Sequence, residues 1–332
     1  MSNLLEVEGL TVALQTKSGY HRAVDDVGFS VGAGEILGIA GESGSGKTMS
    51  ALALLGLLPP GARTSGSVRF DGTDLLALKN KQWRTIRGRR IAMVSQDPAT
   101  SLHPILSIGT QLTEHMRFHL GVSKSEAKTR ATELLATVRI PDPERALGSY
   151  AGQFSGGMRQ RIAIAVALAA EPALLLADEP TTALDVTVQA GILKLLDRLR
   201  RERDLAVIVI THDLGVMSAL ADRIMVMYAG RVAESGARAD LLTQPRHPYT
   251  RGLLDALPHP EGGRNELVPI GGSPPSLGNI PSGCPFHPRC AHAQPSCVTS
   301  RPDPVPVAAG HLLACPPDPF SPDRVPDREV LA

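Results

Sequence analysis

The stretch Gly-Glu-Ser-Gly-Ser-Gly-Lys-Thr at residues 41–48 decides the fold. It follows a short apolar run at 35–40 and leads into a helix-favouring segment, 48–58, that stops at two prolines. Glycines let the backbone curl until several N–H groups point at one anion, and the N-terminus of the next helix adds a favourable dipole. The pattern G-x-x-x-x-G-K-S/T between a strand and a helix therefore predicts a phosphate-binding loop.

The side chains of this loop have expected tasks. Lys47 supplies a positive charge to the β- and γ-phosphates of a nucleotide, and Thr48 offers a hydroxyl to Mg²⁺. The alternative, a glycine-rich turn with an accidental lysine, is disfavoured by the strand and helix on either side. The residues expected to bind the nucleotide are Gly41, Ser43, Gly44, Ser45, Gly46, Lys47 and Thr48.

A second motif, Leu-Leu-Leu-Ala-Asp-Glu-Pro at 174–180, is an apolar strand that ends in two carboxylates. In phosphate-loop enzymes an acid at a strand end holds Mg²⁺, directly or through water, and we assign this role to Asp178. Glu179 follows at the carboxyl edge, where open α/β sheets bind ligands, and can polarise an attacking water as a general base. The alternative is an ordinary solvated strand end.

Proline and cysteine divide the chain of 332 residues. Seventeen of its 27 prolines lie from Pro258 onward, and all four cysteines lie between Cys284 and Cys315. Earlier segments alternate between β-rich runs and helical patterns, which indicates an α/β domain. We expect a main domain at 1–257 and a small, irregular, cysteine-rich extension at 258–332 that ends in a flexible tail.

The hydrophobic patterns place the main strands. Segments 5–12 and 23–31 alternate and predict antiparallel strands, whereas the apolar runs at 91–94, 174–177 and 207–210 are typical of buried parallel strands. A late hairpin is expected over 225–233.

Composition excludes several classes of function. The net charge of +1 gives no bulk attraction to nucleic acid or to anionic lipid, and 3% aromatic residues provide no platform for stacking bases. No apolar run reaches the ~20 residues that span a bilayer, and the N-terminus lacks a secretory pattern. We expect a cytoplasmic chain, for which any membrane role requires a membrane-spanning partner.

The segment Phe-Ser-Gly-Gly-Met-Arg-Gln-Arg at 154–161 begins like a helix that Ser155 could cap. It resembles the signature motif, usually L-S-G-G-Q, of ATP-binding-cassette (ABC) nucleotide-binding domains, with Phe154 and Met158 as departures that are familiar in the peptide-importer branch. In the same order, Gln96 resembles the Q-loop, Ala-Leu-Asp at 183–185 the D-loop and His212 the switch histidine.

The resemblance implies a fold and a mechanism. The fold would comprise a RecA-like core, an antiparallel β subdomain and a helical subdomain, with ATP and Mg²⁺ as cofactors. Two such domains would pair head to tail around two ATP molecules. His212 would contact the γ-phosphate, and Gln96 would approach the metal and the attacking water. The signature residues and the D-loop acid would complete the nucleotide site across the dimer: Ser155, Gly156, Gly157 and Asp185.

The adenine contact departs from the family pattern. The family stacks adenine on an aromatic residue near the end of the first strand, where this chain has Leu14. Tyr20 is the best available substitute, and a plain surface-loop residue is the alternative.

The four cysteines have the spacing C-x₅-C-x₆-C-x₁₇-C. In a cytosolic chain, clustered cysteines favour a metal over disulfides, and four thiolates suit either zinc or an iron–sulfur cluster. Four unligated cysteines are the plain alternative. The ligands would be Cys284, Cys290, Cys297 and Cys315.

Two further segments narrow the resemblance. His-Pro-Tyr-Thr-Arg-Gly-Leu-Leu at 247–254 and Gly-Cys-Pro-Phe-His-Pro-Arg-Cys at 283–290 resemble the C-terminal region of the oligopeptide/dipeptide (and nickel) importer group. In that group the four cysteines are associated with a 4Fe–4S cluster, so the resemblance implies one here.

The family resemblance implies an ATP-hydrolysing subunit of an ABC importer for di- or oligopeptides. Its partners would be two integral-membrane permeases, a second related ATPase and, through the permeases, an extracytoplasmic binding protein, with the chain at the cytoplasmic face of the cell membrane. Nickel or another small solute is an alternative substrate. A soluble ABC ATPase of DNA repair is disfavoured because no sustained heptads, the pattern of a coiled coil, separate the phosphate loop from the signature motif. A module without catalysis is disfavoured because the catalytic positions are present.

Overall fold

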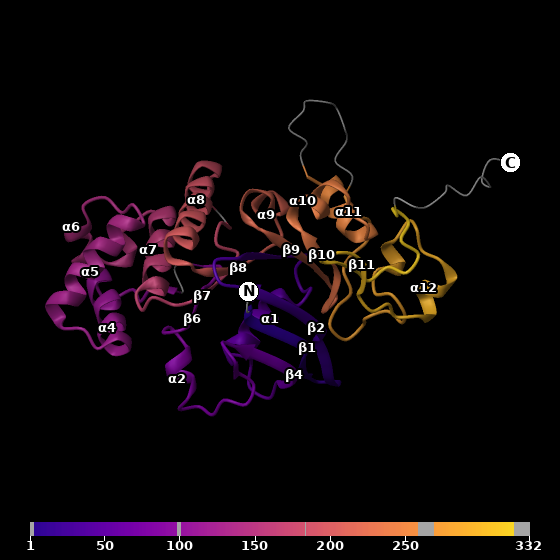
Figure 1. Ribbon diagram of the computed structural model, residues 1–332, viewed down its shortest axis with the longest axis horizontal. Helices are drawn as coiled ribbons and strands as arrows, with labels where there is room; N and C mark the ends of the chain where they lie inside the picture. The colour runs from indigo at the N-terminus through magenta and orange to yellow at the C-terminus, as the bar shows by residue number, and fades with distance from the viewer. Residues whose placement is uncertain (1–2, 98–100, 183, 258–268, 322–332) are drawn as a thin grey trace.

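The computed structural model describes residues 3–97, 101–182, 184–257 and 269–321. A central eight-stranded sheet lies between a helical layer and a second, four-stranded sheet (Figure 1). The helical segment 108–168 lies at one end of the molecule and the C-terminal extension at the other.

The central sheet is parallel in its middle and antiparallel at one edge. Its strand order is β11-β12-β10-β9-β3-β8-β7-β6. Strands β9, β3, β8, β7 and β6 run parallel, and β10, β12 and β11 add antiparallel neighbours. The strands are β3 (Ile36–Ala40), β6 (Ile91–Val94), β7 (Leu174–Asp178), β8 (Ala206–Thr211), β9 (Arg223–Tyr228), β10 (Arg231–Ala237), β11 (Val305–Ala308) and β12 (His311–Leu313).

Alternate residues of the central strands face two different cores. In β8, Val207 and Val209 pack with the helical layer, whereas Ile208 and Ile210 pack toward the second sheet. Because both faces are buried, the strands consist of nearly continuous apolar residues. The buried parallel strands predicted at 91–94, 174–177 and 207–210 are confirmed.

The second sheet is antiparallel, with strand order β2-β1-β4-β5. It confirms the antiparallel pair expected at 5–12 and 23–31, although both strands are longer than expected. Its apolar face packs on the central sheet through residues such as Leu5 and Val24. Its strands are β1 (Asn3–Thr16), β2 (Gly19–Gly32), β4 (Arg63–Phe70) and β5 (Thr73–Asp74).

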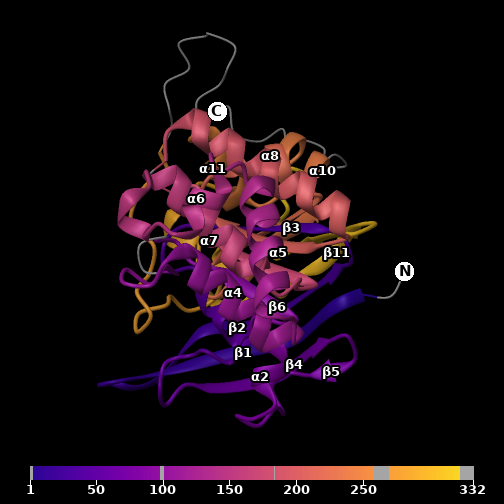
Figure 2. The ribbon, with the colours of Figure 1, turned by 90° about the vertical axis from the view of Figure 1, so that its left-hand side faces the viewer.

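The helices α4 to α7 form the layer that faces the viewer in Figure 2. No described helix is long and apolar enough to cross a bilayer. The helices are α1 (Lys47–Leu54), α2 (Trp83–Ile86), α4 (Ile108–Leu120), α5 (Lys124–Thr137), α6 (Pro143–Leu147), α7 (Gly156–Leu168), α8 (Val186–Arg203), α9 (Leu214–Leu220), α10 (Arg238–Thr243), α11 (Pro248–Asp255) and α12 (Pro295–Thr299), with short 3-10 turns η1 (Ala151–Gln153) and η2 (His287–Arg289).

Two local expectations have different outcomes. The helix expected over 48–58 ends earlier, at Leu54, because Gly56 adopts a left-handed φ of 58° rather than continuing to the prolines. A Cβ at Gly56 would lie 2.6 Å from the Trp83 ring, so this turn also needs the close approach that glycine permits. The late hairpin is confirmed: β9 and β10 are joined by Ala229 and Gly230, both with positive φ.

The C-terminal extension is joined to the central sheet. Its strand β12 pairs with β10, so residues beyond 300 extend the sheet that begins in the main domain. The expected division at 257/258 borders residues 258–268, which lie outside the described set, and it stays a prediction. The expected flexible tail lies outside the described residues from 322 onward.

A fully buried carboxylate fastens this junction. Glu234 of β10 accepts hydrogen bonds from His311 Nε2 at 2.8 Å and from the backbone N–H groups of Arg246 at 2.8 Å and His247 at 3.0 Å. Burial by itself raises the pKa of Glu234, but these hydrogen bonds outweigh burial and hold its pKa below the ordinary value. Glu234 is therefore ionised and links β10, β12 and the chain before α11.

We expect Glu234→Gln to lower the free energy of unfolding at neutral pH by about 1–3 kcal/mol, because it weakens a buried charged acceptor. A carboxyl with a lowered folded pKa stabilises the fold above its ordinary pKa, near 4.5, and this contribution is lost as the pH falls below that value. The free energy of unfolding, measured with denaturant, should therefore fall less steeply from pH 7 to pH 3 in the variant than in wild type. Exposed Glu8→Gln is the control, and identical pH profiles for Glu234→Gln and wild type would contradict the assignment.

Candidate active site

Three neighbouring parallel strands end at the same edge of the central sheet. Ala40 of β3 lies opposite Thr211 of β8, and Asp178 of β7 lies opposite Ile210. The phosphate loop leaves β3, the acidic pair leaves β7, and His212 follows β8. The register therefore brings together three motifs that are far apart in the sequence.

At two positions of the phosphate loop, the neighbouring backbone leaves room only for glycine. A Cβ at Gly41 would lie 2.2 Å from the Met227 carbonyl oxygen, and a Cβ at Gly46 would lie 2.6 Å from the Ala23 carbonyl oxygen. Both glycines also have positive φ angles, 146° and 100°. Gly46 is the N-cap of α1, so the helix N-terminus points into the loop, as the sequence predicts.

Lys47 is buried beneath the loop. Its Nζ donates to the carbonyl oxygens of Gly41 at 2.6 Å and Glu42 at 2.8 Å. Burial lowers the pKa of Lys47, and the nearby charges of Glu179, Asp178 and Glu42 act in the opposite direction. The ammonium group thus lies near the carboxylates of Asp178 and Glu179 as well as the loop.

Thr48 and Asp178 form an oxygen-rich pair. The Thr48 hydroxyl donates to Asp178 Oδ1 at 3.3 Å. Burial raises the pKa of Asp178, while the Thr48 hydrogen bond opposes this shift. Mg²⁺ prefers oxygen ligands and usually takes only one or two protein groups together with water and phosphate. The pair therefore fits a magnesium ion that arrives with a nucleotide.

Glu179 is the point of convergence of the site. Its carboxylate accepts hydrogen bonds from Gln96 Nε2 at 3.0 Å and from the Thr182 hydroxyl at 2.8 Å, and it contacts His212 Nδ1 at 3.1 Å. Its φ of 47° is unusual for a residue other than glycine, and such strain often marks a functional position. The predicted trio Glu179, Gln96 and His212 is brought together in this structure.

The partners of Glu179 favour its ionised form. Burial alone raises the pKa of Glu179, but the hydrogen bonds from Thr182 and His212 and the charges of His212 and Lys47 lower it below the ordinary value. Thr182 is a residue of this site that the sequence does not point to. Its only signal is a hydroxyl residue three positions after the acid, which is too common a pattern to be diagnostic.

The signature segment begins a helix, as its sequence predicts. Ser155 caps α7 by accepting from the Met158 N–H at 3.4 Å, and Asp185 caps α8 by accepting from the Val188 N–H at 2.9 Å. A Cβ at Gly157 would lie 2.5 Å from Val188 Cγ1, so this glycine allows α7 to approach α8. Ala183 of the expected D-loop lies outside the described residues. The contacts of Ser155, Gly156, Gly157 and Asp185 across a dimer stay predictions.

Tyr20 lies at the tip of the β1–β2 hairpin, opposite Gln15, and is 40% exposed. The Arg63 guanidinium lies 3.9 Å from the centre of its ring and covers one face. Its contact with adenine stays a prediction.

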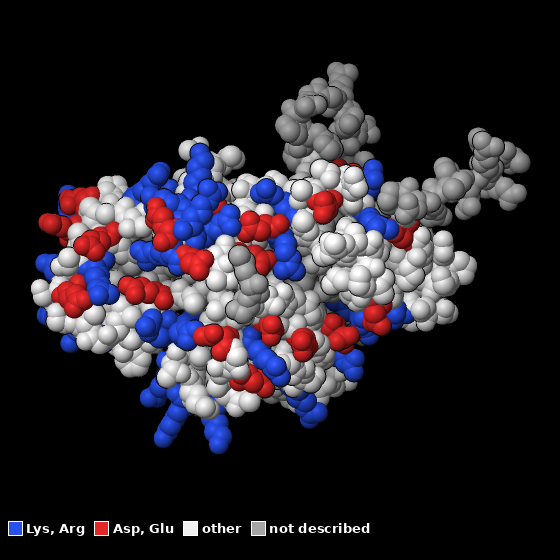
Figure 3. All heavy atoms as spheres, viewed as in Figure 1, with Lys and Arg blue, Asp and Glu red and all other residues white. Residues whose placement is uncertain are grey.

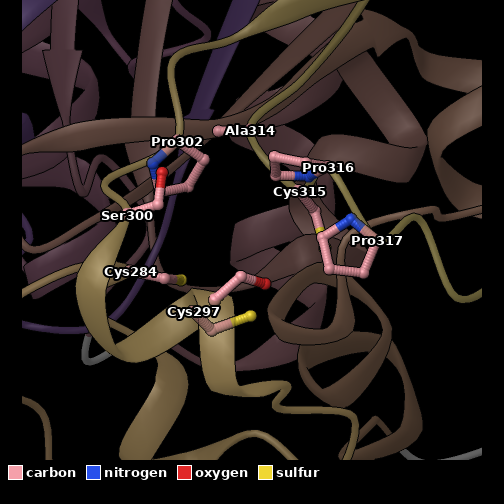
Figure 4. Close-up of a pocket in the computed structure, with 9 residues that line it drawn as sticks. Cys284, Cys297, Ser300, Pro302, Ala314, Cys315, Pro316 and Pro317 are labelled. Carbon is pink, nitrogen blue, oxygen red and sulfur yellow. The ribbon is translucent and has the colours of Figure 1, made fainter.

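The predicted metal site of the extension is wrong. Among the described residues, no group of three or more His, Cys, Asp or Glu side chains is placed to hold a metal ion, and all four cysteines are free thiols. Cys284, Cys297 and Cys315 line one pocket without forming a ligand set (Figure 4). Burial raises the pKa of Cys284, of Cys290 and, to about 12, of Cys315, which favours neutral thiols. The sequence shows how many thiols the extension carries, but not how far apart they lie in the folded chain.

Solved structures share this fold. The dimeric ATP-binding cassette MJ0796, bound to ADP and Pi, superposes with a TM-score of 0.64 at 30% identity and covers 70% of this chain and 98% of its own. The cbiO1 protein of Clostridium perfringens, part of an ABC transporter complex, gives a TM-score of 0.62 at 27% identity over 73% and 91% of the two chains. Fold and site thus define an ABC-type ATPase cassette, as the sequence predicts.

Sequence relatives narrow the class. Residues 24–182 match the ABC transporter model, and residues 233–297 match the model for the C-terminal region of oligopeptide/dipeptide transporters. The oligopeptide transport ATP-binding protein OppD of Salmonella typhimurium is 48% identical over 94% of this chain and 93% of its own. The dipeptide transport ATP-binding protein DppD of Bacillus subtilis is 46% identical over 95% of both chains. The chain belongs to the family of ATP-binding proteins of oligopeptide and dipeptide ABC transporters.

Thr182 provides a test of the site electrostatics. Because its hydroxyl helps to lower the pKa of Glu179, we expect Thr182→Val to raise that pKa and to move the acidic limb of the ATPase pH–rate profile to higher pH. The variant Thr182→Ser, which keeps the hydroxyl, should retain the wild-type profile. Steady-state ATPase assays from pH 5 to pH 9 measure the shift, and an acidic limb that stays in place in Thr182→Val would refute the role of this hydrogen bond.

Proposed function

We propose that this chain is the ATP-hydrolysing subunit of an ABC importer that takes up di- or oligopeptides. The observation that carries the hydrolytic part is the convergence of Gln96, Thr182 and His212 on the Glu179 carboxylate beside the phosphate loop. The peptide substrate is supported by the names of the relatives and by the transporter C-terminal region at residues 233–297.

Nucleotide binding would use the loop and the acid at the end of β7. Backbone N–H groups of residues 41–48 would surround the phosphates, and Lys47 would exchange its loop carbonyl contacts for the β- and γ-phosphates. Thr48 and Asp178 would hold Mg²⁺, with Gln96 as the third expected contributor. Bound Mg²⁺ supplies positive charge that neutralises the phosphate oxygens.

Hydrolysis would depend on the ionised Glu179. An ionised carboxylate accepts a hydrogen bond from water and so orients and polarises it for attack. Gln96 and Thr182 hold one oxygen of Glu179, and His212 lies at the other. The His212 side chain is 61% exposed, which leaves it accessible to a γ-phosphate that arrives from solvent.

Two cassettes would act together. Ser155, Gly156, Gly157 and Asp185 would complete the nucleotide site of a partner cassette, and the N-terminus of α7 is suited to an anion by its dipole. The dimeric solved structure of MJ0796 supports pairing as the working state. ATP would favour the closed dimer through differential binding, and hydrolysis would remove that preference.

The chain would associate peripherally with a membrane transporter at the cytoplasmic face. Membrane permease partners follow from the importer assignment; we propose two of them, a related second ATPase and a binding protein outside the membrane.

On the face shown in Figure 3, acidic and basic side chains are interspersed. This face therefore presents no field of a single sign, such as the positive field that attracts nucleic acid. An importer of nickel or another small solute remains the second candidate, since the substrate path lies in the partners.

Replacing the proposed general base is the direct test of hydrolysis. We expect Glu179→Gln to lower steady-state ATP turnover by at least about 100-fold while ATP binding persists, because the variant keeps the shape of the site but cannot accept a proton. Turnover and nucleotide binding are measured on the same preparation. Glu171→Gln, at an exposed ion pair with Arg130, is the matched control. Unchanged turnover in Glu179→Gln would remove Glu179 from this role.

The importer assignment is tested on native membranes. Affinity purification of the tagged full chain in mild detergent should recover integral-membrane permeases together with a second ATPase. Uptake of labelled dipeptides and oligopeptides should fall when Glu179→Gln replaces the wild-type chain, because hydrolysis drives transport. Recovery of the chain alone, together with unimpaired uptake, would contradict the assignment.

A further inference from the structure

An acidic residue within the phosphate loop is held at three points. The Glu42 carboxylate accepts two hydrogen bonds from Arg289, Nη1 to Oε2 at 2.6 Å and Nη2 to Oε1 at 3.0 Å. Its backbone N–H donates to the Tyr249 hydroxyl at 2.8 Å, and its carbonyl accepts from Lys47 Nζ at 2.8 Å. Arg289 and Tyr249 belong to the C-terminal part of the chain, which therefore grips the loop that begins after β3.

Burial and further hydrogen bonds hold the Arg289 side chain in place for this contact. Its side chain is only 5% exposed, and its Nε donates to the Gly271 carbonyl oxygen at 2.8 Å. Its Nη1 also donates to the Tyr228 hydroxyl at 3.2 Å, and the guanidinium lies 5.8 Å from the ring centres of Tyr228 and Phe286. A planar, two-pronged pair of this kind fixes orientation as well as charge.

The other contact is equally well supported. Tyr249 is fully buried, and its ring lies 4.6 Å from that of Tyr228 and 5.3 Å from that of Phe286. This aromatic cluster joins β9, α11 and the cysteine-rich segment in one core. The position of the loop backbone at Glu42 is thereby coupled to the packing of the extension.

The charge of Glu42 opposes the task of the loop. A carboxylate close to the binding site of a polyanion repels the phosphates, and the Glu42 charge is near enough to act on the pKa of Lys47. Arg289 offsets that charge at short range in a largely buried setting, where screening by salt is weak. The ion pair thus keeps Glu42 as a fixed point of the loop and offsets the repulsion between its carboxylate and the nucleotide phosphates.

We propose that Arg289 is a positioning residue for ATP: it neutralises and orients Glu42, so that the C-terminal extension sets the affinity of the phosphate loop for nucleotide. This inference rests on the proposed role of the loop in binding ATP. It assigns the extension a part in the ATPase site itself, through a contact between residues 247 positions apart.

The test is a double-mutant cycle on the full chain that removes the two charges singly and together, with binding of Mg-ATP measured by calorimetry and turnover by ATPase assay. We expect Arg289→Ala to weaken ATP binding and raise KM about tenfold, equivalent to about 1.4 kcal/mol, with a smaller change in kcat. Adding Glu42→Gln to Arg289→Ala should restore most of the affinity, because the repulsive charge is gone. A purely structural role predicts no such rescue. Arg251→Ala, at an exposed pair in α11, is the matched control and should bind ATP as wild type does.

The outcomes separate this inference from the proposed function. Normal ATP affinity in Arg289→Ala, or a double variant no better than Arg289→Ala, overturns the inference while leaving the site intact. Unaltered binding in Lys47→Ala would instead overturn the role of the loop. If Arg289→Ala fails to fold, Arg289→Lys decides. Lysine keeps the charge but loses the second hydrogen bond to Glu42, so we expect ATP affinity below that of wild type, which Glu42→Gln restores. Wild-type affinity in Arg289→Lys, or no restoration by Glu42→Gln, overturns the inference.

Discussion

The parallel register of β3, β8 and β7 is the constraint on which the rest of the structure depends. It aligns Ala40 with Thr211 and Asp178 with Ile210, so the phosphate loop, the acidic pair and His212 leave the sheet at one edge. A shift of one residue would move every side chain to the opposite face. Both faces are buried against different apolar layers, so such a shift would exchange two cores, and the register is strongly specified.

Within this edge, burial and hydrogen bonding give two adjacent carboxylates different properties. Burial raises the pKa of Asp178, whereas the partners of Glu179 lower the pKa of its carboxyl. Neighbouring acids whose pKa values shift in opposite directions are suited to separate tasks, here a metal contact and an ionised carboxylate that can accept a proton from water. The backbone at Glu179 is left-handed, and its carboxylate contacts Gln96 and His212.

The C-terminal extension has a different character from the one its cysteines suggested. It supplies β12 to the central sheet, His311 to the buried Glu234 and Arg289 to the phosphate loop. The thiols of Cys284 and Cys290 pack at the edge of the aromatic core around Tyr249, where burial favours their neutral form. The extension is therefore integrated with the nucleotide site through hydrogen bonds and packing.

The sequence by itself determined the phosphate loop, the order of the motifs and the main strands. These features are local: each depends on residues a few positions apart, whose geometry follows from backbone rules and hydrophobic periodicity. Only the tertiary structure decided that Thr182 joins Gln96 and His212 on Glu179 and that Arg289 pairs with Glu42. It also decided that the cysteines form no ligand set within the part of the chain that the structure describes. Distances between residues remote in the chain are set by how the layers pack, and sequence spacing does not carry that information.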